Sequence, residues 1–258
     1  MLVIYLFVFI IGAIFGSFFN VCIHRIPNKE SIVFPASHCP ACNSHIKPYH
    51  NIPLLSFIFL KGKCNYCGAK ISIRYFWVEL ITAILYVLAF KANNSIFDLE
   101  LLENIIFISF SIIIFFIDWE KGLIPDVLNL PLLGIGIIFS LFKIKLVILQ
   151  SLIGGGVIFI LLMIIAYTCE IIKKKNCIGG GDIKYLVAIG TGFGLVHTFF
   201  IMFFASVFAL IFLIVTKFDL KKSFPFGPFL AISAVLNIFF GNAIVKFYID
   251  NLIHNPIW

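Results

Sequence analysis

Charged side chains are scarce in this sequence. Asp, Glu, Lys and Arg together make up 12% of the 258 residues, whereas they make up about a quarter of a typical soluble domain. Hydrophobic residues make up 62%, and the mean hydropathy is +1.11. Several apolar runs are long enough to cross a bilayer. The scarcity of charge therefore excludes an ordinary soluble domain and predicts an all-α polytopic membrane protein.

Two further absences narrow the class of protein. The first apolar run, Leu2 to Val21, lacks a basic leading region and a small-residue cleavage site, which is typical of a retained membrane span rather than of a removed signal peptide. No basic stretch is interleaved with aromatic residues at base-stacking spacing, so we expect no nucleic-acid partner. The net charge of +7 is explained instead by cytoplasmic loops, which collect Lys and Arg in membrane proteins.

The apolar runs predict about eight transmembrane helices in membrane lipid. One long polar segment interrupts them after the first span. We therefore divide the chain into a first transmembrane helix (1–21), a small cytoplasmic module (22–75) and a membrane domain of about seven spans (76–258). The apolar runs of the membrane domain are 76–92, 101–118, 127–142, 146–169, 184–197, 198–216 and 228–248.

The distribution of basic residues sets the expected orientation. With eight spans and the segment 22–75 inside, fifteen of the nineteen Lys and Arg residues lie in inside loops. This asymmetry places the polar segment in the cytoplasm and both termini outside. Asp118 ends one span and Asp182 precedes another, so both carboxylates are expected at the inner, cytoplasmic face of the membrane.

Glycines recur inside the apolar runs at spacings typical of close helix packing. Gly12 and Gly16 form a G-x-x-x-G in the first span, and Gly190 and Gly194 form another in the run 184–197. Such pairs let two membrane helices approach closely. We expect them, and the run Gly154–Gly156, to lie at helix contacts.

Four of the seven cysteines form two C-x-x-C pairs in the polar segment: Cys39 with Cys42 and Cys64 with Cys67. A two-residue gap lets both thiolates of a pair converge on one tetrahedral ion, and two pairs complete four sulfur ligands. The pattern predicts a structural Zn²⁺ site, which is closed and therefore has no catalytic role. Disulfides or free redox thiols are the alternative.

Asp118, in FFIDWEKG, and Asp182, in GGGDIK, are the two carboxylates expected at the same membrane depth. Acids within a membrane usually face a bundle interior or a water-filled cavity. If the two approach each other, they share one proton. Such a dyad can activate water as a base and protonate a peptide carbonyl as an acid. The glycines before Asp182 would leave room for an extended substrate strand.

The residue patterns alone also allow purely structural roles for these carboxylates. Asp182 can be the N-cap of its helix, a position that Asp fills well. Asp126, which follows Pro125, suits a cap even better. Asp118 can be an ordinary residue at the membrane interface.

Several segments of the chain resemble those of a known family. They run in order from the first span into the run 184–197. The last two spans resemble the family only in being apolar. Together they resemble the type IV prepilin leader peptidases, which are integral membrane aspartic proteases with a G-x-G-D motif. The segments are GSFFNVCIHRIP (16–27), CPACNSHIKPYHNIPLLS (39–56), KGKCNYCGAKISIRY (61–75), IDWEKGLIPD (117–126) and GGGDIK (179–184).

The resemblance implies a function and a set of site residues. By position, the two catalytic aspartates of the family fall on Asp118 and Asp182. The family cuts the leader from type IV prepilins and type II secretion pseudopilins at the cytoplasmic face of the bacterial inner membrane. Members with the four-cysteine loop usually also N-methylate the new amino terminus with S-adenosylmethionine. No nucleotide-binding glycine signature is visible, so the sequence names no residue that contacts the methyl donor.

Two other functions compete with this one. A cation-coupled membrane transporter would use Asp118 and Asp182 as ion ligands on broken helices. It would place the acids near the membrane midplane within repeated halves, whereas here they lie at the inner boundary and no clear repeat is present. A non-enzymatic, zinc-bearing membrane scaffold would use both aspartates only as caps.

Overall fold

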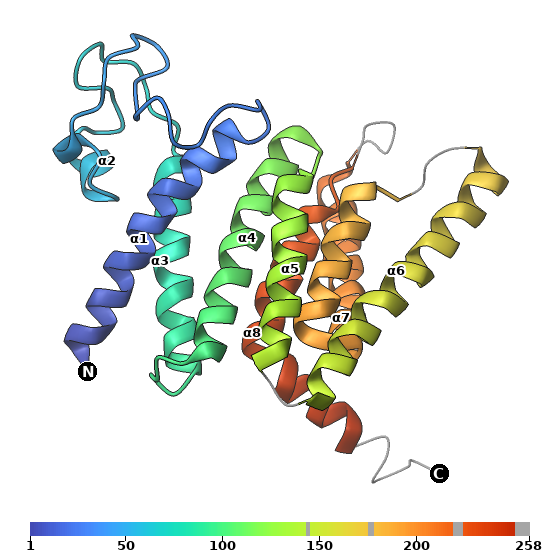
Figure 1. The fold of residues 1–258 in the computed structure, drawn as a ribbon. Helices are drawn as coiled ribbons and strands as arrows, with labels where there is room; N and C mark the ends of the chain where they lie inside the picture. The colour runs from blue at the N-terminus through green and yellow to red at the C-terminus, as the bar shows by residue number, and fades with distance from the viewer. Residues whose placement is uncertain (143–144, 175–177, 219–223, 251–258) are drawn as a thin grey trace. The chain divides into compact units, whose positions relative to one another are not determined.

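The computed structural model describes residues 1–142, 145–174, 178–218 and 224–250, and the regular elements within them are helices (Figure 1). Lys143, Lys175, Lys221 and Lys222, which contribute to the charge asymmetry, lie outside the described residues. The predicted all-α class is confirmed. The elements are α1 (Leu2–Arg25), the 3-10 helix η1 (Pro48–His50), α2 (Leu55–Phe59), α3 (Arg74–Ala92), α4 (Leu99–Lys121), α5 (Asp126–Phe142), α6 (Lys145–Lys173), α7 (Gly180–Thr216) and α8 (Gly227–Ile249).

Six helices within the described ranges are long and apolar enough to cross a membrane: α1, α3, α4, α6, α7 and α8. The helix α5 is apolar but shorter. The chain is therefore a multi-pass membrane protein. The predicted number of eight spans is not confirmed, because α5 is shorter than the six helices and α7 carries the runs 184–197 and 198–216 as one element with a break at Gly194.

The chain folds into two compact units, Met1–Leu101 and Leu102–Trp258. In the first unit α1 and α3 pack side by side in opposite directions, and glycine makes their close approach possible. A Cβ on Gly12 would lie 2.7 Å from the Ala83 Cα, and a Cβ on Gly16 would lie 2.6 Å from the Glu79 Cα. The predicted helix contact at these two glycines is confirmed.

In the second unit α7 packs against α5, α6 and α8 (Figure 1). Glycine again sets the distance between backbones, since a Cβ on Gly154 of α6 would lie 2.5 Å from the carbonyl oxygen of Gly190. The Ser151 hydroxyl of α6 donates a hydrogen bond to the carbonyl oxygen of Thr191. The predicted role of Gly154 and Gly190 at a helix contact is confirmed.

The element α7 reverses direction at Gly194. A straight helix of 37 residues would be about 55 Å long, yet both ends of α7 pack near the same end of α4. Along α4, Tyr185 contacts Ser111, Phe193 contacts Phe107 and Phe212 returns to Trp119. Gly194 has φ +79° and ψ 175°, a backbone conformation that is essentially restricted to glycine.

Replacing Gly194 by alanine tests this turn. We expect Gly194→Ala to lower the free energy of unfolding by about 1–3 kcal/mol, because alanine is strained in this conformation. Gly156→Ala is the matched control, since Gly156 lies within α6 and a Cβ there meets nothing within 4 Å. Thermal unfolding of both purified variants measures the difference. Equal midpoints for the two variants would contradict the assigned turn.

Candidate active site and metal centre

Asp118 lies in the last turn of α4 and is only 5% exposed. The helix stops just beyond it because Gly122 adopts φ +65°, and the Gly122 N–H donates to the Asp118 carbonyl oxygen at 2.8 Å. A glycine with positive φ is a common end for a helix. Within the described residues, the Oδ2 atom of Asp118 is buried and has no hydrogen-bond partner.

Asp182 lies in the first turn of α7 and is half-buried. The N-cap of α7 is Gly179, and Asp182 is the third residue of the helix. The alternative that Asp182 is the N-cap is therefore wrong. Its carboxylate folds back beside Gly179, where an added Cβ would lie 2.8 Å from the Asp182 Oδ2.

Ile124 brings the starts of α7 and α8 against the end of α4. A Cβ on Gly181 would lie 2.9 Å from the Ile124 Cβ, and a Cβ on Gly227 would lie 2.9 Å from the Ile124 Cδ1. The same Cβ on Gly227 would lie 2.7 Å from the Asp118 Oδ2. Asp182 directly follows Gly181, so Ile124 lies between the backbone that carries Asp182 and the glycine beside Asp118. The two predicted residues therefore occupy one region of the second unit.

A buried hydrogen bond fixes α4 against α7 deeper in the bundle. The hydroxyls of Ser111 and Tyr185 are 2.7 Å apart, and Ser111 also donates to the Phe107 carbonyl oxygen at 2.7 Å. Because Ser111 has only one hydroxyl hydrogen, Tyr185 must be the donor between the two side chains. Tyr185 lies one turn beyond Asp182, and Ser111 lies two turns before Asp118. This bond therefore sets the register of the two helices that carry the carboxylates.

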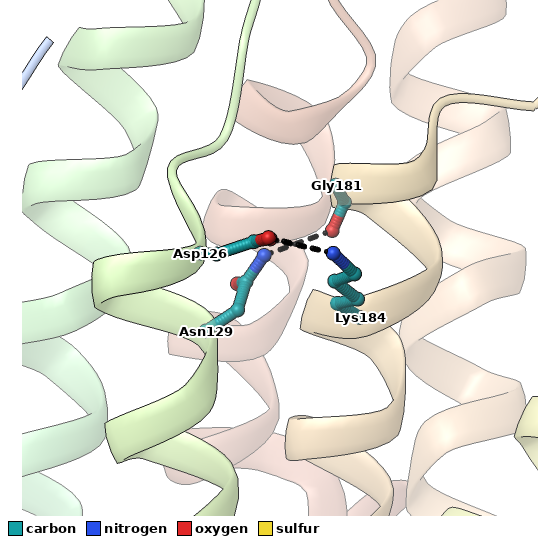
Figure 2. A network of polar contacts seen from close by, with 4 residues as sticks. All are labelled: Asp126, Asn129, Gly181 and Lys184. Atoms are coloured by element: carbon teal, nitrogen blue, oxygen red, sulfur yellow. Dashed lines mark hydrogen bonds and ion pairs between the residues drawn. The ribbon is translucent and has the colours of Figure 1, made fainter.

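Two polar contacts fasten the start of α7 to α5 (Figure 2). The Lys184 Nζ lies 2.8 Å from both carboxylate oxygens of Asp126, and the Asn129 Nδ2 donates to the Gly181 carbonyl oxygen at 3.2 Å. The ion pair is half-exposed, whereas Asn129 is buried. Asp126 is the first residue of α5. Its carboxylate forms the ion pair with Lys184.

The glycines before Asp182 do not all leave open space. The space beside Gly181 is taken by Ile124, and the space beside Gly179 by the Asp182 carboxylate. Only Gly180 has nothing within 4 Å of an added Cβ. The expectation that all three glycines leave room for a substrate strand is wrong for two of them, because the chain itself packs there.

The four predicted cysteines meet in the first unit. The sulfur atoms of Cys39, Cys42, Cys64 and Cys67 all lie within 4.8 Å of one another, and those of Cys39 and Cys67 are 3.9 Å apart. Four thiolates around one Zn²⁺ at about 2.3 Å lie about 3.8 Å apart. The donor set and its spacing fit zinc.

Both cysteine pairs lie on similar short turns. An isolated β-bridge joins His38 to His45, and another joins Lys63 to Lys70. In each turn the residue after the second cysteine has positive φ: Asn43 has +54° and Gly68 has +72°. Hydrogen bonds between Cys42 and the side chain and backbone of Ser44 lower the pKa of the Cys42 thiol to about 6.

A buried carboxylate attaches this module to α3. The Leu54 N–H, just before α2, donates to the Glu79 Oε2 at 2.7 Å. Leu54 has φ +62°, which is uncommon for a bulky residue and marks a constrained turn. Arg25, the last residue of α1, donates to the carbonyl oxygens of Ser31 at 2.9 Å and Pro35 at 2.7 Å. The module is therefore tied to both helices of its unit.

Comparison with known proteins assigns the chain to a family. Residues 10–92 match the bacterial peptidase A24 N-terminal domain, and residues 105–214 match the type IV leader peptidase family. A protein of Dichelobacter nodosus named prepilin leader peptidase/N-methyltransferase is 33% identical over 94% of this chain and 93% of its own length. The chain belongs to the type IV leader peptidase family.

Other relatives carry the same name. The Vibrio cholerae protein is 34% identical over 92% of this chain and 97% of its own length. The Klebsiella pneumoniae protein is 38% identical over 73% of this chain and 84% of its own length. No solved structure was found to match. The resemblance identified from the sequence motifs is thus confirmed, and the members of this leader peptidase family are aspartic proteases.

The family matches divide the predicted site residues between them. The leader peptidase match at 105–214 contains Asp118 and Asp182, and the N-terminal match at 10–92 contains the four cysteines. Sequence reasoning missed Ile124, Asn129 and Gly227, which contact the Asp118 carboxylate or the glycine before Asp182. The stretch FPFGPF at 224–229 carried a signal for Gly227, because a glycine followed by proline is typical of a helix start next to a close contact.

Zinc content tests the metal centre. We expect the purified protein to contain one Zn²⁺ per chain and Cys39→Ser with Cys64→Ser to lose it, because two of the four thiolates are removed. Cys22→Ser is the control, since Cys22 is buried in α1 outside the cluster. Metal analysis by mass spectrometry measures both. Full zinc content in the double variant would rule out the four-thiolate site.

Removal of either hydroxyl tests the register bond between α4 and α7. We expect Ser111→Ala to lower the free energy of unfolding by about 1–2 kcal/mol, because it leaves the buried Tyr185 hydroxyl without an acceptor. Adding Tyr185→Phe to that variant removes the unpaired donor and should restore part of the stability. A double variant less stable than Ser111→Ala would contradict the assigned donor.

Proposed function

We propose that this chain is a prepilin leader peptidase and N-methyltransferase of the bacterial inner membrane. Its substrates would be type IV prepilins and type II secretion pseudopilins, whose leaders it would cut at the cytoplasmic face. The names of its relatives support this proposal. Membrane lipid surrounds the spans, and nucleic acid has no part in the function.

The observation that carries the proposal is the environment of Asp118. A carboxylate that is 5% exposed at the end of a membrane helix normally needs a partner. Here one oxygen has no hydrogen-bond partner among the described residues, and Ile124, which contacts the glycine before Asp182, also contacts Gly227 beside Asp118. Two carboxylates held in such a place share a proton, since both cannot readily ionise. We assign Asp118 and Asp182 as the catalytic pair.

The shared proton gives the pair both of the functions that peptide hydrolysis needs. The ionised carboxylate takes a proton from a water molecule while the water oxygen attacks the scissile carbonyl carbon. The protonated carboxyl group gives its proton to the carbonyl oxygen. The C–N bond then breaks as the first group protonates the nitrogen, and the second group recovers a proton from the tetrahedral diol. The pair ends with one shared proton, as it began.

The starts of α7 and α8 shape this centre. Gly227 lies against the Asp118 carboxylate at the N-terminus of α8, and a helix N-terminus favours negative charge. The substrate must be extended at the scissile bond, so we expect the pilin helix to unwind near its start. Gly180, which has open space beside it, is the glycine of the motif that a substrate can approach.

Zinc and the methyl donor have separate places in the proposal. Zn²⁺ would be held by Cys39, Cys42, Cys64 and Cys67, and it would stabilise the two loops without entering the reaction. S-adenosylmethionine would supply a methyl group to the new amino terminus. The described residues present no cradle that we can assign to this donor, so the methyl transfer rests on the relatives' names alone.

Asparagine substitutions test the catalytic pair. We expect Asp118→Asn and Asp182→Asn each to abolish leader cleavage, because neither variant can share and return a proton, while the amounts of protein in the membrane stay unchanged. The effect should be at least about a thousandfold on kcat, since residues that act as a unit fail together. Cleavage of a full-length prepilin in membrane vesicles, followed on gels, measures it.

Asp126→Asn is the matched control, because Asp126 is half-exposed and pairs with Lys184. It should retain processing, since an exposed ion pair contributes little. Mass analysis of the product from the wild-type protein should show one added methyl group when S-adenosylmethionine is present. Wild-type processing by both catalytic variants would refute the peptidase assignment.

A further inference from the structure

Asn129 has one hydrogen-bonded and one unpartnered polar atom at the start of α7, the helix that carries Asp182. Its side chain is 1% exposed, in the first turn of α5. Its Nδ2 donates to the carbonyl oxygen of Gly181, the residue directly before Asp182 (Figure 2). Its Oδ1 is buried and has no hydrogen-bond partner among the described residues.

The orientation of this amide follows from its partner. A backbone carbonyl oxygen can only accept a hydrogen bond, so the atom that faces Gly181 must be the NH₂ group. The acceptor Oδ1 is thereby directed elsewhere. Buried polar atoms in folded proteins are nearly always hydrogen-bonded, so the free Oδ1 points to a ligand that carries an N–H or O–H group.

An extended peptide supplies such a group. A substrate strand that has left its helix exposes backbone N–H groups, which need acceptors in a site that excludes water. The bond from Asn129 to Gly181 ties this acceptor to the backbone next to Asp182. We therefore expect a peptide that reaches the Asp182 carboxylate to pass close to Asn129.

We propose that Asn129 is a substrate-positioning residue of the peptidase site: its Nδ2 holds Gly181 and its Oδ1 accepts a hydrogen bond from a backbone N–H of the extended substrate next to the scissile bond. This proposal rests on the proposed function, because it takes Asp118 and Asp182 as the catalytic pair. It concerns a contact outside the pair, so it can fail while the pair stands.

Ester substitution in the substrate tests the contact directly. A series of synthetic prepilin peptides carries one backbone ester each, flanking the scissile bond, so that each peptide lacks one N–H. With the wild-type protein in nanodiscs, we expect one ester position to lower kcat/KM about three- to tenfold, the effect of losing one hydrogen bond. In Asn129→Ala that same ester should change kcat/KM less than about twofold, because its acceptor is gone.

Two further variants keep the result interpretable. Asn129→Asp keeps an acceptor but loses the donor to Gly181, so its overall kcat/KM should fall while it still discriminates against the same ester. Asn129→Ser replaces Asn129→Ala if the latter does not fold, because the shorter side chain cannot reach both partners. Asp126→Asn, at the exposed contact to α7, should leave the ester profile as in the wild-type protein.

The same ester profile in the wild-type protein and in the truncated variant would overturn the substrate contact. The cleavage assay separates this outcome from failure of the proposed function. If Asp118→Asn and Asp182→Asn are inactive but the ester profile does not depend on residue 129, only the present inference is wrong. If those two variants cleave normally, the catalytic pair itself is wrong.

Discussion

A carboxylate buried at the end of a membrane helix is costly unless neighbouring groups stabilise its charged or its protonated form. In the second unit, two helix starts are packed around one such carboxylate. Asp118 is buried where α4 ends, and α7 and α8 both begin beside it. Those helix starts can come so close only because Gly181 and Gly227 lack side chains, since a Cβ on either would lie within 3 Å of Ile124 or Asp118. These two glycines thus allow both helix starts to pack close to Asp118.

The reversal of α7 at Gly194 lets one element of 37 residues pack along α4 twice. One element carries Asp182 at its start, descends along α4 as far as Phe107, and returns until Phe212 lies beside Trp119. The apolar rings of the returning part cover the same end of α4 that carries Asp118. Behind them, the bond between Ser111 and Tyr185 fixes the register. A small number of contacts therefore determines where the two carboxylates lie relative to each other.

The cysteine cluster and the shared membrane depth of the two carboxylates were predictable from the sequence. The contacts between distant residues were not, for physical reasons. The cysteine cluster follows from local spacing, because a C-x-x-C turn brings its own sulfurs together. The shared depth of Asp118 and Asp182 follows from alternating spans and the charge of the loops. The glycine followed by proline marks Gly227 as a helix start, but the partners of Asn129 and Gly227 were not predictable, since they lie far away in the chain. The G-x-x-x-G at Gly190 indicated helix packing, but the pattern does not reveal that Gly194 also turns the chain through a conformation that only glycine adopts readily.

We propose above all that Asp118 and Asp182 act as one unit that shares a proton. The most direct measurement is the pH dependence of kcat/KM for cleavage of a prepilin peptide by the purified protein. We expect a bell-shaped profile, because activity requires one carboxylate ionised and the other protonated, and Asp126→Asn should keep the same shape. A kcat/KM that only rises or only falls with pH would contradict the shared proton. So would a kcat/KM that stays constant across the range in which the protein is folded.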